Sequence, residues 1–203
     1  MAIVVEHEKR RFEILQRALD VFTEEGYEDA TFQKIADRCG ITRTTLYLYF
    51  KNKREIFVWS IKQLTISVEK NLREMIESPG LTYADRLVRV MHAIIDRCTE
   101  NRKLFNVILT YLLQAQKTGK DPDSRVKRRT IRLRHLLSQI IITGINAGEF
   151  RHVNVKQANE MLYGLIESTI YRIAILDHPE ADDMKEAVAL AVQSLVIHTS
   201  DEG

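Results

Sequence analysis

The sequence predicts an all-α protein, and three observations carry this prediction. The chain of 203 residues contains only 3 prolines and 8 glycines, about half the share that these residues take in an average protein. Tight turns are therefore scarce, which argues against hairpin-rich sheets. Apolar residues recur at helical spacing along most of the chain, and no segment alternates apolar and polar residues for long enough to form a strand.

The composition excludes several classes of protein. Hydrophobic residues make up 45% and charged residues 29% of the chain, as expected for a globular protein with a real core and not for a disordered one. No uncharged stretch approaches the ~20 residues of a membrane-spanning helix, and the N-terminal apolar segment is too short for a signal peptide. Cys39 and Cys98 lie far apart in the sequence. The simple inference is a reduced, cytoplasmic protein.

About nine helices are expected in order along the chain. The first covers residues 6–25, ends at Gly26, and places these apolar residues at helical spacing: Phe12, Leu15, Ala18, Leu19 and Phe22. Two short helices follow, and a long helix over residues 54–77 then carries one apolar stripe until Ser78-Pro79-Gly80 stops it. The later helices are expected over residues 82–99, 102–117, 123–147, 155–177 and 182–198.

Residues 31–53 form the most informative segment. Thr31 is the expected N-cap of a helix that runs to residue 38, and Thr42 that of a helix over residues 43–50. Gly40 supplies a left-handed turn position between them. Two short helices joined in this way form a helix-turn-helix, whose second helix enters the DNA major groove. The residues expected to pack inward are Phe32, Ile35, Ala36, Ile41, Leu46 and Phe50.

The other side chains of this segment suit DNA. Arg43 can donate a bidentate pair to guanine, and Gln33 can pair with adenine. Leu48 and the methyl group of Thr44 can contact a thymine methyl. Hydroxyl groups that can reach phosphate oxygens belong to Thr31, Thr42, Thr45, Tyr47 and Tyr49. Lys53 begins the next helix, where its charge and the backbone N–H groups can hold a phosphate.

The charge distribution supports a specific anion-binding surface. The net charge is +2, yet residues 31–54 hold six basic residues and one acidic residue, whereas residues 151–203 hold four basic and nine acidic residues. A basic segment in a nearly neutral chain indicates a local site rather than a generally cationic protein. The plain alternative is a three-helix bundle whose outer side is simply polar.

The segment GYEDATFQKIADRCGITRTTLYLYFKNKREIF, residues 26–57, resembles the N-terminal domain of the tetracycline-repressor (TetR) family of bacterial transcription regulators. The resemblance covers roughly residues 8–57, and the rest of the chain matches only in general plan. It implies a DNA-binding domain over residues 1–53 and a helical domain for effector binding and dimerisation over residues 54–203. It also assigns base contacts to Gln33, Arg43, Thr44 and Leu48, and phosphate contacts to Thr31, Thr42, Thr45, Tyr47, Tyr49 and Lys53.

Two residues depart from the family pattern. Thr44 stands where many members have a small residue or proline, which can alter the approach to the groove. Cys39 replaces the usual alanine or leucine of the turn. A buried, inert thiol is the simple interpretation, and redox sensing is the alternative.

The C-terminal helices supply candidates for both roles that the resemblance implies. Residues expected at a dimer interface of four helices are Gly164, Ser168, Ile175, Val188, Ala191 and Leu195; the alternative is that both helices are ordinary core helices. Polar or aromatic residues within apolar helices are the effector-site candidates: Trp59, His92, Cys98, Asn106, Tyr111, Gln114, Tyr163, Glu167 and Tyr171. The alternative is that each is a satisfied core or surface residue.

The remaining motifs limit the function. Residues 125–134 hold six basic residues; interleaved apolar residues favour a solvated helix face, with an anionic effector or acidic partner as the alternative. The histidines lack ligand spacing, so a metal site is not expected. No other cofactor is predicted. No common catalytic motif is present. We expect a homodimeric repressor that a small molecule releases from a palindromic operator; the alternatives are a regulator without an effector, an activator, or a helical enzyme or carrier.

Overall fold

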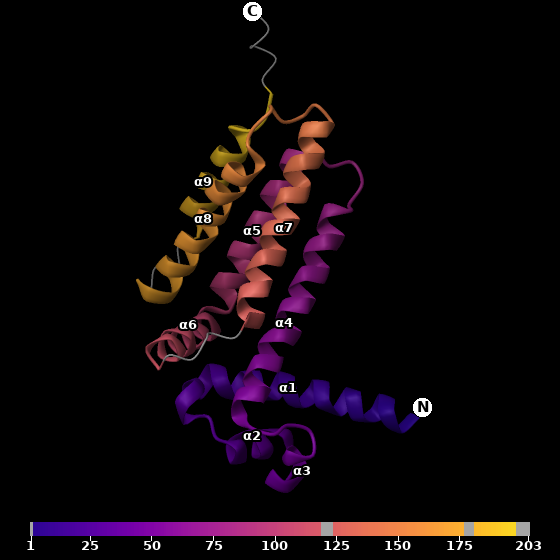
Figure 1. The fold of residues 1–203 in the computed structure, drawn as a ribbon, viewed down its shortest axis with the longest axis vertical. Coiled ribbons are helices and arrows are strands. Elements are labelled where there is room, and N and C mark those ends of the chain that lie inside the picture. Colours follow the sequence, from indigo (N-terminus) through magenta and orange to yellow (C-terminus); the bar gives the residue numbers. More distant parts are fainter. Residues whose placement is uncertain (1, 119–123, 177–180, 198–203) are drawn as a thin grey trace, which may run out of the picture. The chain divides into compact units, whose positions relative to one another are not determined.

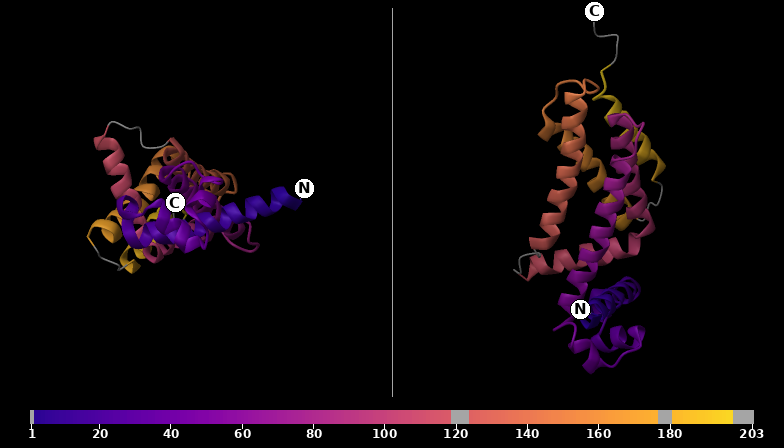
Figure 2. Two further views of the ribbon diagram at one scale, coloured as in Figure 1. Left: turned by 90° about the horizontal axis from the view of Figure 1, so that it is seen from below. Right: turned by 90° about the vertical axis from the view of Figure 1, so that its right-hand side faces the viewer.

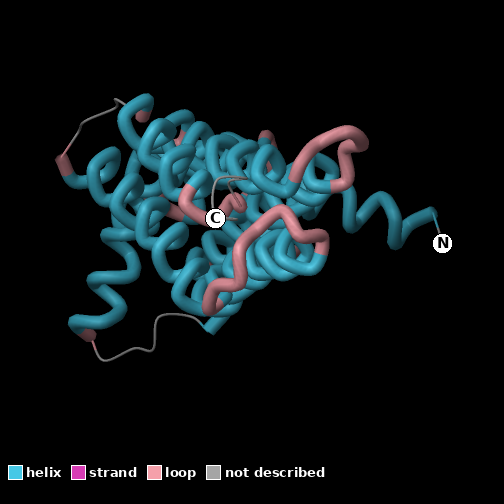
Figure 3. The backbone as a smooth tube through the Cα atoms, turned by 90° about the horizontal axis from the view of Figure 1, so that it is seen from above, coloured by secondary structure: helices cyan, strands magenta, loops and turns pink. Residues whose placement is uncertain are grey.

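The computed structural model describes residues 2–118, 124–176 and 181–197, with the side chains of residues 2–4, 124–130, 174 and 175 left outside the description. This part of the chain is built from helices and loops (Figure 3). Its nine helices are α1 (Ala2–Asp29), α2 (Phe32–Cys39), α3 (Arg43–Tyr47), α4 (Lys53–Ile76), α5 (Tyr83–Glu100), α6 (Arg102–Lys117), α7 (Ser124–Asn146), α8 (Val155–Ile175) and α9 (Asp182–Gln193). The predicted all-α fold is confirmed.

Residue contacts divide the chain into two compact units. Unit 1 comprises Met1–Val68 and Asn106–Asp121, and unit 2 comprises Glu69–Phe105 and Pro122–Gly203. Helices α4 and α6 each run from one unit into the other. Unit 1 is larger than the DNA-binding domain predicted over residues 1–53, because it also includes the first part of α4 and most of α6. The boundary after residue 53 stays a prediction about where the DNA-binding function ends.

Unit 1 is organised around α1. Helices α2 and α3 pack together on one side of α1 (Figure 2). Gly26 has φ 84° and ψ 166°, which interrupts the helix where the sequence predicted its end. Phe12, expected in the apolar stripe, is 49% exposed, whereas Ile14 and Val21 are buried. The buried stripe is therefore rotated slightly from the predicted one.

An aromatic cluster joins α1, α4 and α6 within unit 1. The Tyr111 ring lies 4.7 Å from Tyr27 and 4.9 Å from Phe57, and Phe57 lies 4.9 Å from Phe22. Edge-on aromatic pairs of this kind stabilise a core beyond simple area burial. Burial, followed by the neighbouring Tyr111, raises the pKa of Tyr27 to about 12. The cluster ties the first part of α4 and the helix α6 to α1.

Unit 2 is a bundle of long helices. Helix α5 packs against α7, α8 and α9, and these four helices lie side by side in Figure 1. The spacing of apolar residues in α5 explains its central position, since Leu87, Val90, Met91, Ile94, Ile95 and Cys98 are all buried. Burial raises the pKa of Cys98 to about 12.

The N-terminus of α5 is held by two sets of hydrogen bonds. Thr82 and Asp85 form a reciprocal capping box at the start of the helix. The Glu149 carboxylate, from the segment between α7 and α8, accepts hydrogen bonds from the N–H groups of Tyr83 and Ala84, both at 2.7 Å. A carboxylate at this position satisfies unpaired N–H groups and complements the helix dipole. The first turn of α5 is therefore fixed in place.

Candidate nucleic-acid interface

Three residues close the helix ends around the turn between α2 and α3. The Thr31 hydroxyl accepts a hydrogen bond from the Lys34 N–H at 3.2 Å, and the Thr42 hydroxyl accepts one from the Thr45 N–H at 3.1 Å. Gly40 adopts φ 65° and ψ 35°, the left-handed conformation that lets its N–H close α2. The predicted caps and turn are present, and they form a helix-turn-helix.

The inward side of this motif is apolar. Leu46 and Phe50 are 0% and 1% exposed, and they pack in the unit 1 core with the α2 residues Phe32, Ile35 and Ala36. Helix α3 is shorter than predicted, because it ends at Tyr47 rather than near residue 50. The chain nevertheless stays tightly turned there, since the Phe50 N–H donates to the Leu46 carbonyl at 3.1 Å. Burial of both residues fixes the orientation of α3.

The outward side of α3 presents a large apolar residue and a positioned arginine. Leu48 is 75% exposed and Tyr47 is 49% exposed. An Arg43 guanidinium nitrogen donates to the Tyr47 hydroxyl at 3.2 Å, and the guanidinium lies 5.7 Å from the centre of that ring. The Tyr47 ring in turn stacks on Phe32 at 4.6 Å. Tyr47 therefore links Arg43 to the core while both side chains remain accessible.

The predicted phosphate-binding residues differ in how far contacts within unit 1 already occupy their side chains. The hydroxyl oxygens of Thr42 and Thr45 lie 2.8 Å apart on the exposed side of α3. Tyr49 is partly exposed, and its ring stacks on His7 at 4.5 Å. The Lys53 ammonium donates to the Glu28 carbonyl at 2.9 Å and lies 4.7 Å from the centre of the Tyr27 ring. Lys53 is thus anchored to the end of α1, with only part of its donor capacity left for a phosphate.

Acidic residues of α1 reduce the local positive charge. The Arg38 guanidinium makes two hydrogen bonds to the Glu24 carboxylate, at 2.6 and 3.0 Å, and Lys34 pairs with Glu25. The sequence window of residues 31–54 does not include these acids, so it overstated the cationic surface. The charge that remains for DNA is concentrated near α3 and the start of α4.

All ten predicted DNA-contact residues are exposed or partly exposed in unit 1: Thr31, Gln33, Thr42, Arg43, Thr44, Thr45, Tyr47, Leu48, Tyr49 and Lys53. The Gln33 amide already donates to the Asp37 carboxylate at 2.7 Å, so pairing with adenine requires that this bond break or reorient. Their contact with DNA stays a prediction.

The predicted effector residues are divided between the two units. Trp59, Asn106, Tyr111 and Gln114 belong to unit 1, and His92, Cys98, Tyr163, Glu167 and Tyr171 belong to unit 2. Tyr111 is a core residue whose hydroxyl accepts from the Arg54 side chain at 3.1 Å. On α8, Tyr163 is buried whereas Tyr171 is 55% exposed, because residues eight apart drift around a helix by about 80°. Their role in effector binding stays a prediction.

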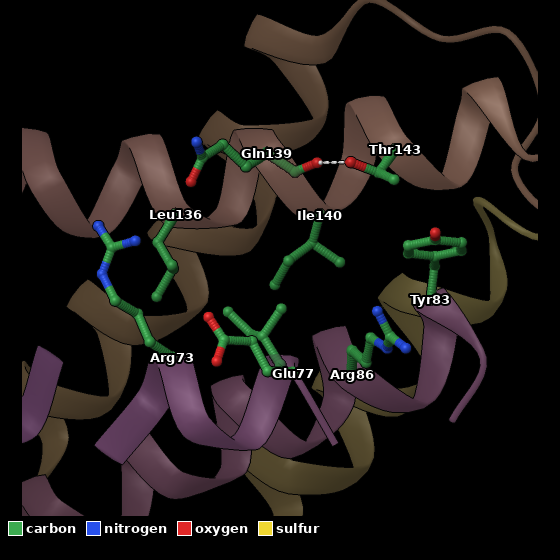
Figure 4. A pocket seen from close by; sticks show the side chains of 9 residues that line it. Arg73, Glu77, Tyr83, Arg86, Leu136, Gln139, Ile140 and Thr143 are labelled. Carbon is green, nitrogen blue, oxygen red and sulfur yellow. Dashed lines mark hydrogen bonds between the residues drawn. The ribbon is translucent and has the colours of Figure 1, made fainter. Parts of the chain in front are cut away.

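A pocket of about 220 Å³ lies within unit 2, among α4, α5 and α7 (Figure 4). None of the predicted effector residues lines it. Its lining includes Arg73, Tyr83, Arg86, Leu136, Ile140 and Thr143. Sequence reasoning missed these residues because they lie on three helices, and a cavity leaves no periodic signal in any one of them.

The predicted dimer residues fall into two groups. Gly164 and Ser168 are exposed on α8, and Ala191 is partly exposed on α9. Val188 and Leu195 are 0% and 2% exposed, so they pack inside their own subunit, as in the alternative of ordinary core residues. The side chain of Ile175 lies outside the described residues.

The basic run over residues 125–134 lies partly outside the described side chains. Arg132 pairs with Glu69 at 3.4 Å, and Arg134 pairs with Glu160 while its guanidinium lies 4.0 Å from the centre of the Tyr163 ring. These two residues therefore behave as a solvated helix face with neighbours of opposite charge. Among the described residues there is no cluster of possible metal ligands and no helix able to span a membrane.

A capped helix-turn-helix with an exposed arginine and leucine, followed by a helical bundle, defines a DNA-binding regulator of the helix-turn-helix class. The family model described as "Bacterial regulatory proteins, tetR family" matches residues 14–58, and the model described as "Tetracyclin repressor-like, C-terminal domain" matches residues 80–171. The chain belongs to the TetR family of transcription regulators.

Relatives and solved structures agree with this assignment. The chain is 26% identical over 159 residues to the fatty acid metabolism regulator protein of Bacillus subtilis (strain 168), which covers 78% of this chain and 80% of that protein. A TetR transcription regulator from Haloarcula marismortui superposes with a TM-score of 0.83 at 21% identity, covering 94% of this chain and 100% of that one. FadR from Bacillus subtilis, solved in complex with stearoyl-CoA, superposes with a TM-score of 0.73 at 23% identity, covering 92% and 98%. Because the family consists of regulators, the prediction that this chain is not an enzyme is confirmed.

Proposed function

We propose that this protein is a homodimeric repressor that binds a palindromic operator through α3 and is released by a small-molecule effector in the cytoplasm. The exposed surface formed by Arg43, Tyr47 and Leu48 carries the DNA-binding part. A leucine that is 75% exposed contributes little to packing within the subunit, yet it can meet a thymine methyl group in the major groove. Arg43 lies one helical turn before Tyr47 and contacts it, with donors suited to guanine.

An exposed apolar face on α8 and α9 supports the homodimer. Met161 and Tyr171 on α8 are 42% and 55% exposed, and Leu190 on α9 is 76% exposed. Gly164 and Ser168 are small residues on the exposed side of α8, so they allow a partner helix to approach closely. A two-fold axis across this face would cover the apolar residues of both copies.

The dimer is tested by sedimentation of the full chain. Leu190→Glu should convert the dimer to a monomer, because it places a charge in the covered face. Leu113→Glu is the matched control, since Leu113 is 56% exposed but lies on α6 in unit 1. A Leu190→Glu protein that still sediments as a dimer would reject this face.

Two observations support an effector. Unit 2 contains a pocket, and the related FadR of Bacillus subtilis was solved with stearoyl-CoA. The long helix α4 connects the two regions through the chain itself, since it begins at Lys53 beside the helix-turn-helix and ends at Ile76 in the pocket lining. The effector must favour a different state of the dimer from the one that DNA favours, because a ligand with equal affinity for both shifts nothing.

DNA binding is tested by footprinting the DNA upstream of the protein's own coding region. An inverted repeat there should be protected. Arg43→Ala should cost about 1–3 kcal/mol at one base position and relax specificity there. Lys51→Ala is the control, because loss of an exposed charge should weaken binding to all sequences alike. An operator preference unchanged by Arg43→Ala would reject the assignment of this residue.

The same footprint distinguishes the alternatives. Release of the protected DNA by a compound supports an effector-controlled repressor. Protected DNA that no compound releases favours a regulator without an effector, and increased transcription from the bound promoter favours an activator.

A further inference from the structure

We infer that the pocket among α4, α5 and α7 binds a small organic anion, a monocarboxylate with a short apolar tail. The inference deepens the proposed function, because it names the ligand class of an effector, and it rests on that function for the effector role alone. It is based on the two arginines and the buried aliphatic residues that line one cavity of unit 2.

Arg86 supplies the main binding group. Its Nε is buried and has no hydrogen-bond partner, and one terminal nitrogen makes only a long hydrogen bond to the Ser78 carbonyl, at 3.5 Å. Its guanidinium lies 5.1 Å from the centre of the Tyr83 ring. The Arg86 guanidinium therefore has N–H donors that can bind a ligand. A carboxylate fits them best, because its two oxygens can accept from two N–H groups of the guanidinium at once.

The first turns of α5 hold Arg86 toward the pocket. Tyr83 begins the helix, and its N–H is fixed by the Glu149 carboxylate at 2.7 Å. Arg86 follows three residues later, on the same side of the helix as Tyr83. The binding group therefore comes from a rigid part of the unit, which reduces the entropy lost when a ligand binds.

The rest of the lining sets the charge and shape of the ligand. In the view of Figure 4, Arg73 and Arg86 lie on opposite sides of the Glu77 carboxylate. No described carboxylate forms an ion pair with either arginine. Two cations and one anion favour a ligand with a single negative charge, since Glu77 opposes a higher one.

The apolar part of the pocket limits the tail. Leu136 and Ile140 of α7 are 7% and 3% exposed, and Ile76 of α4 faces the same cavity. The volume of about 220 Å³ is smaller than the ~300–1,000 Å³ of sites for drug-sized ligands. A short aliphatic carboxylate such as hexanoate is therefore a suitable probe.

Binding is measured by calorimetry on the full-length protein with hexanoate, 1-hexanol and inorganic phosphate. Hexanoate should bind more tightly than either of the others, because only hexanoate has both a carboxylate and a tail. Arg86→Gln should weaken hexanoate binding by about ten-fold or more, and Arg73→Gln by about three-fold because its side chain is exposed. Glu77→Gln should tighten binding by about two- to five-fold.

Control variants distinguish a loss of ligand binding at the pocket from a loss of folding, and the DNA footprint tests the proposed function independently. Arg89→Gln removes the same charge from an exposed residue of α5 outside the pocket and should leave the dissociation constant unchanged. Glu77→Gln tests the site in the opposite direction, so loss of folding cannot imitate its effect. Absence of hexanoate binding, equal binding of hexanol or phosphate, or equal affinity of the Arg86→Gln and wild-type proteins would overturn the inference. The operator footprint without ligand tests the proposed function separately.

Discussion

Glu149 provides the most informative test of the way in which unit 2 is held together. Its carboxylate accepts two backbone hydrogen bonds from the first turn of α5, each at 2.7 Å. The same turn carries Tyr83 and precedes Arg86, two residues of the pocket. Glu149→Ala removes both acceptors, whereas Glu149→Gln keeps one oxygen that can accept a hydrogen bond and loses the charge.

The size of the effect follows from these contacts. A hydrogen bond to a charged group contributes about 1.5–3 kcal/mol when it is well shielded, and a carboxylate at a helix N-terminus adds about 0.3–1 kcal/mol. Glu149 is only half-buried, so water can replace part of what is lost. We therefore expect Glu149→Ala to lower the free energy of unfolding by about 2 kcal/mol and Glu149→Gln by about half as much.

Thermal and urea unfolding measure this effect. For a chain of this length, 1 kcal/mol corresponds to about 2–4 °C in Tm, so Glu149→Ala should lower Tm by about 4–8 °C. Glu186→Gln, an exposed carboxylate on α9, controls for the loss of charge alone. A Glu149→Ala protein that melts within about 1 °C of wild type would contradict this expectation, because the two hydrogen bonds would then contribute no net stability.

Three further predictions concern stability and reactivity. A Cβ on Gly144 would lie 2.3 Å from the buried Phe150 ring, so Gly144→Ala should lower the free energy of unfolding in urea by about 1–3 kcal/mol despite the ~1 kcal/mol gained in helix propensity. Adding Phe150→Leu should restore part of this stability, and an unchanged midpoint for Gly144→Ala would contradict the clash. Hydrogen bonds from Thr82 lower the pKa of Asp85 from 3.8, so its stabilisation is complete above that value and is lost as the pH falls through the lower folded pKa; Asp85→Asn should remove this acid-dependent loss from unfolding midpoints. Burial raises the pKa of Cys98 to about 12, so the native thiol should not react with a thiol reagent near neutral pH, and fast labelling would show that it is accessible.

The helix-turn-helix could be predicted closely because its signals are local. Thr31 and Thr42 cap helices a few residues away, and Gly40 has the backbone freedom that its own turn requires. The apolar spacing of α2 and α3 likewise predicted their buried residues correctly. The end of α3 was misplaced because Leu46 and Phe50 are buried by the whole unit, and burial does not require a continuous helix between them.

The pocket could not be predicted because it depends on neighbours far along the chain. Arg73, Arg86 and Leu136 meet only when α4, α5 and α7 pack together. The predicted row of Tyr163, Glu167 and Tyr171 runs from a buried end to an exposed end, and its role in effector binding stays a prediction. Helical spacing places residues along a helix but does not say which neighbour covers each turn.

The amino-acid sequence alone predicts the all-α class, the helix-turn-helix with its caps and turn, and the TetR resemblance, because propensities, capping and periodicity act over a few residues. The packing of the helices was needed to show which arginines share a cavity, that Glu149 fixes the start of α5, and that acids of α1 pair with the basic residues of α2. Each of these contacts joins residues that are distant in the chain. Folding brings them together through burial of apolar surface. Because this driving force is not directional, the local sequence does not indicate which distant residue a side chain will contact.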